Sequence, residues 1–105
     1  MDINVSTDNT IHGDARVIEV AEQAVNNDLG HMSDWLTRVE VHLKDQNGDK
    51  KGPVHICCTM EARPRGLGPL SAHADAGDIP AALKGAATKL RGRLSSLQAK
   101  HDPHR

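Results

Sequence analysis

Five cations follow one another near the carboxyl end of the chain with no acid between them. They are Lys84, Lys89, Arg91, Arg93 and Lys100. Lys and Arg side chains bind phosphate oxygens in a way that depends little on nucleotide sequence and strongly on salt. A run of charge by itself more often marks a solvated surface whose aliphatic stems cover the core. The absence of acids between 79 and 100 favours contact with a polyanion.

The formal net charge of −1 conceals an uneven distribution of charge along the chain. Residues 1–83 contain seven Lys or Arg and thirteen Asp or Glu, a net charge of −6. Residues 84–105 contain six Lys or Arg and one Asp, a net charge of +5. A basic segment joined to an acidic body predicts a local positive patch that the charge of the whole chain hides.

Seven histidines raise the question of a metal site. His101 and His104 have the close spacing typical of zinc ligands, but they lie in the terminal segment that we expect to be frayed. His42, His55 and His73 are far apart in sequence, and we expect them to be exposed on one face of a sheet. We predict no metal and no cofactor, although a metal-binding regulatory role is kept as a further hypothesis.

Adjacent cysteines, Cys57 and Cys58, raise the question of nucleophilic catalysis. Neighbouring residues of a strand point to opposite faces, so this pair cannot form an ordinary disulfide with itself, which fits a reducing compartment. Cys57 shares a face with His55, but the sequence provides no third orienting group and no oxyanion donor. The segment 64–69, PRGLGP, lacks the pattern of a phosphate loop. We therefore predict that the protein is not an enzyme.

The elements that must hold these residues follow from hydrophobic periodicity. Alternating residues predict strands at 1–6, 37–44, 54–63 and 70–75, with an Asn-Gly turn in the loop 45–53. Apolar residues at steps of three and four predict helices at 14–29 and 78–100. The first stripe consists of Val17, Ile18, Ala21, Ala24, Val25 and Leu29. The second consists of Ile79, Leu83, Ala86, Leu90, Leu94 and Leu97, with Asp78 as the N-cap.

The order β-α-β-β-β-α, with one apolar face on every element, predicts a two-layer α+β sandwich. Both helices then cover one face of a four-stranded sheet. The other face is left to solvent and carries Arg38, His42, Lys44, His55, Arg63 and His73. We expect a single domain at 1–100 and a flexible tail at 101–105. No signal peptide or membrane span is visible, which predicts a cytoplasmic protein without a membrane partner.

Several segments together resemble the short ribosome hibernation-promoting factor and ribosome-associated inhibitor family, also called sigma-54 modulation protein or ribosomal protein S30Ae. The resemblance lies in the opening MDINVST, then RVEVHLKDQNG and HICCTMEA, and most specifically in LSAHADAGDIPAALKGAATKLRGRLSSL. It covers nearly the whole chain. It implies the same β-α-β-β-β-α fold, similar to double-stranded RNA-binding domains.

The resemblance also implies a function. Members of the family are bacterial proteins that bind the small ribosomal subunit over the messenger RNA and transfer RNA sites and silence translation in stationary phase or stress. By the same resemblance, Lys84, Lys89, Arg91 and Arg93 match the family's basic helix and Lys100 its extension. Lys44 and Arg63 occupy strand positions where members place charges.

The sequence therefore supports two hypotheses about function. The first is a hibernation factor whose basic carboxyl-terminal helix holds ribosomal RNA, with a second hibernation factor as a further partner. Recognition of A-form RNA by shape and backbone needs no aromatic stacking platform, so the absence of Phe and Tyr does not oppose it. The alternative is a diverged member of the same fold that acts as a protein–protein interaction or regulatory module without ribosome binding.

Overall fold

The computed structural model describes residues 1–8, 11, 14–46 and 55–100. In these ranges the chain forms β1 (Asp2–Thr7), α1 (Ala15–Leu29), the short 3-10 helix η1 (Gly30–Met32), β2 (Leu36–Asp45), β3 (Ile56–Pro64), β4 (Leu70–Ala76) and α2 (Ile79–Lys100). The predicted order of strands and helices is thus confirmed, with boundaries shifted by one or two residues. The Asn-Gly turn, Val54 at the start of the third predicted strand and the predicted tail at 101–105 lie outside the described residues.

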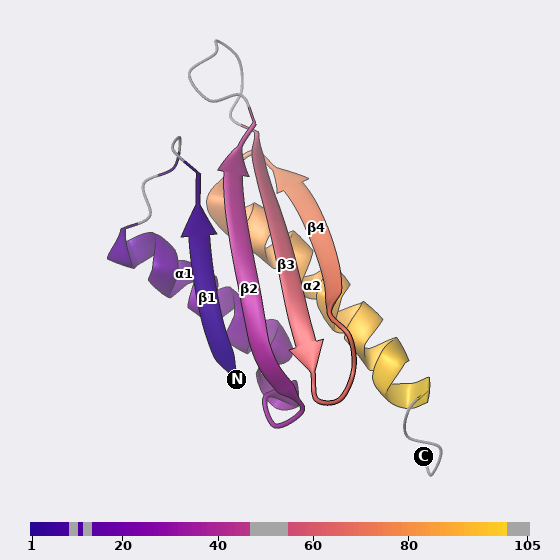
Figure 1. Cartoon of the computed structure of the whole chain (residues 1–105). Helices are drawn as coiled ribbons and strands as arrows, with labels where there is room; N and C mark the ends of the chain where they lie inside the picture. Colours follow the sequence, from indigo (N-terminus) through magenta and orange to yellow (C-terminus); the bar gives the residue numbers. More distant parts are fainter. Residues whose placement is uncertain (9–10, 12–13, 47–54, 101–105) are drawn as a thin grey trace.

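The four strands form one mixed sheet in the order β1-β2-β3-β4. β1 runs parallel to β2, while β2, β3 and β4 are antiparallel neighbours. The parallel pair is possible because α1 crosses over between β1 and β2, whereas the later strands are joined directly. Both helices lie on the same side of the sheet, behind the strands in Figure 1. The predicted two-layer α+β sandwich is therefore correct.

The core lies between the sheet and the helices and is made of aliphatic side chains. Strand residues alternate between this core and the open face, so Val39, Val41 and Leu43 of β2 are buried while His42 and Lys44 are exposed. β3 follows the same alternation, with Ile56, Cys58 and Met60 buried. The sheet thus separates a dry face under the helices from a polar face in water, as the period of two predicts.

α1 begins after Asp14, whose carboxylate accepts a hydrogen bond from the Val17 backbone N–H at 3.0 Å. Its buried residues are Ala21, Val25, Asp28 and Leu29. The expectation that Ile18 belongs to the buried stripe is wrong, since its exposed fraction is 38%. Asp28 is buried on this side of the helix instead. The pattern of apolar residues did not predict its burial.

α2 packs against β4, β3 and α1. Its N-cap is Asp78, as predicted: the carboxylate accepts from the Ala81 N–H at 2.8 Å. Leu83, Ala86, Leu90 and Leu94 of the predicted stripe are buried, and Ile79 and Leu97 at its two ends are half-buried. Because the stripe is narrow, the cations fall into two margins, one facing α1 and the other facing β4. No helix in the described ranges is long and apolar enough to cross a membrane.

Candidate nucleic-acid interface

The margin of α2 that faces α1 holds Lys84 and Arg91, and both converge on Asp28 of α1. The Arg91 Nη1 atom donates to Asp28 Oδ1 at 2.9 Å, and Lys84 Nζ lies 3.9 Å from Asp28 Oδ2. Thr88 Oγ1 lies at 3.5 Å from the same carboxylate. Only 3% of the Asp28 side chain is exposed, whereas 45% of Arg91 and 71% of Lys84 are. A buried carboxylate must be paired, so Arg91 satisfies the fold before any ligand.

The margin that faces β4 is arranged differently. Lys89 Nζ donates to the backbone carbonyl of His73 at 3.0 Å, and Arg93 Nη1 donates to the backbone carbonyl of Ser71. These carbonyls belong to β4, an edge strand of the sheet. A carbonyl carries no net charge, so the positive charges of Lys89 and Arg93 are held in place without being neutralised.

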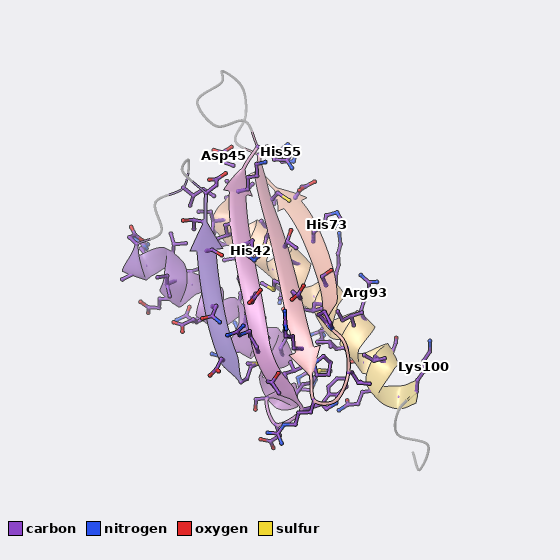
Figure 2. All side chains as sticks on the ribbon, in the orientation of Figure 1. His42, Asp45, His55, His73, Arg93 and Lys100 are labelled. Atoms are coloured by element: carbon purple, nitrogen blue, oxygen red, sulfur yellow. The ribbon has the colours of Figure 1, made fainter. Side chains whose placement is uncertain are left out.

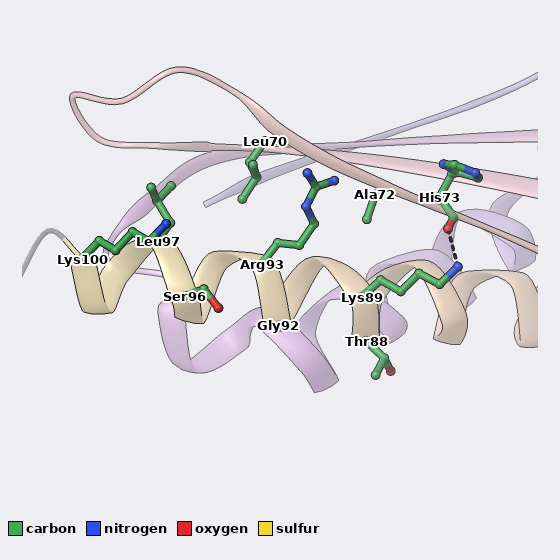
Figure 3. A pocket seen from close by; sticks show the side chains of 10 residues that line it. All are labelled: Leu70, Ala72, His73, Thr88, Lys89, Gly92, Arg93, Ser96, Leu97 and Lys100. Carbon is green, nitrogen blue, oxygen red and sulfur yellow. Dashed lines mark hydrogen bonds between the residues drawn. The ribbon is translucent and has the colours of Figure 1, made fainter.

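A groove of about 710 Å³ runs between β4 and the carboxyl-terminal half of α2, and Figure 3 shows the side chains that line it. Its walls are formed by Leu70, Ala72, His73, Thr88, Lys89, Gly92, Arg93, Ser96, Leu97 and Lys100. Three of these residues are permanent cations and none is an acid. We call this feature the β4 groove, and its composition suits an anionic ligand that lies along the helix.

Two glycines of α2 differ in how closely the helix approaches β4 beside them. A Cβ atom built on Gly85 would lie 2.9 Å from the Cβ of Ala74, so helix and strand are in contact there. A Cβ built on Gly92 meets nothing within 4 Å. Gly85 is therefore the closely packed glycine of α2, and Gly92 is the exposed one.

The remaining predicted site residues, Lys44 and Arg63, lie on the open face of the sheet and not beside the helix. Lys44 of β2 is opposite Cys57 of β3. Arg63 forms an ion pair with Glu61 at 3.3 Å, and Arg38 forms an equivalent pair with Glu40 at 3.3 Å. The seven predicted residues are therefore three separate groups: the Asp28 cluster, the β4 groove and the open face.

The cysteines divide as the alternation predicts, with Cys58 buried and Cys57 half-buried. Burial raises the pKa of Cys58 to about 12. Partial burial, followed by a hydrogen bond to Asp75, raises the pKa of Cys57. A nucleophilic cysteine needs a lowered pKa, so neither thiol has the properties of a catalytic one. Within the described ranges no three His, Cys, Asp or Glu side chains are placed to hold a metal ion.

Asp28 is the residue of this site that the hydrophobic pattern did not identify. It lies three residues after Val25 and seven after Ala21, which places it on the buried stripe of α1. A single acid on an otherwise apolar stripe is a signal for a buried partner of opposite charge. Two cations on the α1-facing margin of α2 could have been matched to it.

The sheet order, the parallel first pair and the two helices on one face define a ribosomal-protein-S30Ae-like α+β fold. Two solved structures share it. A ribosomal subunit interface protein from Coxiella burnetii superposes with a TM-score of 0.77 at 14% identity, over 94% of this chain and 99% of that one. The amino-terminal domain of Protein Y from Thermus thermophilus superposes with a TM-score of 0.75 at 14% identity, over 92% of this chain and 99% of that one.

No protein-family model and no curated protein matches the chain. At 14% identity the two structural similarities establish a shared fold. This is the fold that the sequence resemblance implies, and both neighbours belong to the hibernation-promoting factor family.

Proposed function

We propose that this protein binds the small ribosomal subunit through the β4 groove of α2 and inhibits translation by occupying the messenger RNA and transfer RNA sites. It would act without catalysis, in the bacterial cytoplasm during stationary phase or stress, alongside a second hibernation factor. The observation that carries the proposal is the groove itself, where the described lining residues include Lys89, Arg93 and Lys100 and no acid. The fold shared with a ribosomal subunit interface protein supports the choice of the ribosome as partner.

The hydrogen bonds to β4 prepare Lys89 and Arg93 for this role. A lysine ammonium has three donors and an arginine guanidinium has five, so one bond to a carbonyl leaves most donors for a ligand. The carbonyls of His73 and Ser71 fix the direction of both side chains, which lowers the conformational entropy lost when a phosphate binds. The cations therefore need little rearrangement to meet an RNA backbone.

The predicted residues differ in their expected contribution to RNA binding. Lys89, Arg93 and Lys100 are the primary RNA contacts. Lys84 and Arg91 contribute to the same field, but the buried carboxylate of Asp28 offsets part of their charge. Lys44 and Arg63 lie on the open face and can meet only RNA that passes around the edge of the sheet.

Co-sedimentation with purified small ribosomal subunits at low and moderate salt tests the proposal. Wild-type protein should sediment with subunits at low salt and be released as salt rises, because phosphate contacts are accompanied by counterion release. The double substitution K89E/R93E should abolish sedimentation at both salt concentrations. Lys89→Gln and Lys84→Gln each remove one lysine charge from α2. Lys84→Gln is the matched control, and it should reduce binding far less than Lys89→Gln.

Two results would overturn the proposal: no binding of the wild-type protein at low salt, or unchanged binding by K89E/R93E. The alternative function, a protein-interaction module of the same fold, predicts a partner whose capture survives nuclease treatment and does not require Lys89. Capture that nuclease abolishes would exclude that alternative.

A further inference from the structure

Three histidines lie on the open face of the sheet, and one of them, His73, also borders the β4 groove. Figure 2 shows His42 on β2, His73 on β4 and His55 immediately before β3, on the side opposite the helices. His42 and His73 lie in one row across the sheet, because both are register partners of Thr59. The same row continues to Ser6 of β1, whose Oγ lies 2.9 Å from His42 Nδ1. His55 lies 3.6 Å from Asp75 of β4.

The other charges on this face nearly cancel. The strands contribute the cations Arg38, Lys44 and Arg63 and the acids Asp2, Glu40, Glu61 and Asp75. Arg38 with Glu40 and Arg63 with Glu61 are ion pairs, and Asp2 is the register partner of Arg38. A hydrogen bond from Cys57 lowers the pKa of Asp75, which keeps that carboxylate charged, while the Cys57 thiol stays neutral.

With neutral histidines, the strand residues of the open face sum to −1, from three cations and four acids. With the three histidines protonated the sum is +2. Asp8 and Asp45 at the strand ends lower both sums equally and leave the difference of three charges unchanged. Histidine is the side chain whose charge changes between pH 5 and 8. With Asp8 and Asp45 included the two sums are −3 and 0, so charged histidines cancel the net negative charge that repels a polyanion from this face.

The open face is continuous with the β4 groove. His73 belongs to both surfaces: its backbone carbonyl accepts the bond from Lys89, and its ring lies on the open side of β4, as Figure 3 shows. An RNA backbone that lies in the groove has only the β4 edge to cross before it meets the His73 ring.

The composition of the face favours RNA over a protein partner. Ile18, the exposed large hydrophobic residue of the described chain, is on α1 and not on this face. Protein interfaces are centred on buried aromatic or aliphatic anchors, and the strands present none here. Polar side chains on an open sheet face suit phosphates and ribose hydroxyls, which need no anchor pocket.

We propose that the open face of the sheet is a second, proton-dependent RNA surface on which His42, His55 and His73 contact phosphates once they are charged. This inference rests on the proposed function, because it extends the same ligand class from the groove onto the sheet. The protein would then bind RNA more tightly as the surrounding pH falls from neutral towards 6.

Fluorescence anisotropy with a labelled A-form RNA duplex tests this inference. Affinity is measured at pH 7.5 and pH 5.8 at one ionic strength, the lower value being above the range in which ordinary carboxylates titrate. Wild-type affinity should rise about tenfold on acidification, as expected for one or two added phosphate contacts at about 0.1 M salt. The triple substitution H42Q/H55Q/H73Q, compared with its own affinity at pH 7.5, should lose the rise.

His31→Gln is the matched control, because His31 is an exposed histidine in η1, outside the sheet, and its loss should leave the rise intact. The three single His→Gln variants serve as a check on the triple variant, and each should lose part of the rise. A rise that persists in the triple variant, or in all three single variants undiminished, would overturn the inference.

The same experiment distinguishes failure of the histidine surface from failure of the proposed function. Binding at pH 7.5 without a rise at pH 5.8 would overturn the histidine surface and leave groove binding standing. Binding that appears only at pH 5.8 and disappears in H42Q/H55Q/H73Q would support the histidine surface and contradict the groove. An absence of RNA binding at both pH values would overturn both.

Discussion

The two margins of α2 carry the same kinds of side chain but place them in different electrostatic surroundings. On the α1-facing margin, Arg91 pairs at 2.9 Å with a carboxylate that is 3% exposed. On the β4-facing margin, Arg93 donates to an uncharged carbonyl of an edge strand and has no ion pair within the described part of the chain. Arg91 and Arg93, which are separated by one glycine, thus differ in role: the charge of Arg91 is paired with a buried carboxylate, and the charge of Arg93 can act on a ligand. A run of cations in a sequence is therefore not one site, and the partner of each cation decides whether it serves the fold or a ligand.

The largest effect should come from the arginines themselves. Arg91→Ala leaves the Asp28 carboxylate buried without its closest cation, so we expect a loss of about 2–3 kcal/mol in the free energy of unfolding. Arg93→Ala removes a bond from an exposed guanidinium to a carbonyl that water can reach, and should cost less than about 1 kcal/mol. Chemical denaturation of both variants measures the difference, with Arg91→Lys as a variant that restores part of the loss.

RNA affinity should show the opposite order, with Arg93→Ala the more damaging substitution. Equal losses of stability in Arg91→Ala and Arg93→Ala would contradict the division of α2 into a structural and a ligand-facing margin.

Substitution of the two glycines of α2 should have a smaller effect on stability. The sign should be opposite at Gly85 and Gly92. Gly85→Ala places a methyl group 2.9 Å from the Ala74 Cβ, and the overpacking should outweigh the gain in helix propensity, for a net loss of about 1 kcal/mol. Gly92→Ala enters open space and should stabilise the helix by about 1 kcal/mol. Thermal unfolding of the two variants checks this. Stabilisation by both would mean that α2 does not contact β4 at Gly85, and the groove would then extend along the whole helix.

The fold could be predicted from the sequence because the apolar residues of each helix and strand recur with a clear period. Alternation from Val39 to Leu43 and the steps from Leu83 to Leu94 predict a strand and a helix, and they also predict which side of each is dry. The site was only partly predictable. Periodicity shows that Lys84 and Arg91 flank one side of the stripe, but not that α1 lies there with an acid in reach. That pairing joins residues 63 positions apart and depends on the packing of the two helices.

A final, smaller prediction concerns Asp75, the exposed counterpart of Asp28. A hydrogen bond from Cys57, with a lesser contribution from His55, lowers the pKa of Asp75 in the folded state. A lowered carboxylate pKa contributes stability that is present above the unfolded-state value, about 3.9, and is lost as the pH falls through the folded-state value. Asp75→Asn should therefore lower stability slightly at pH 7, where this contribution is present, and make the acid-induced loss less steep below about pH 4.

Unfolding measured from pH 7 to pH 2.5, in wild type and Asp75→Asn, is the required experiment. The matched control is Asp2→Asn, a carboxylate on the same face for which no such hydrogen bond is present. An unchanged acid profile in Asp75→Asn would show that the Cys57–Asp75 bond does not favour the charged carboxylate.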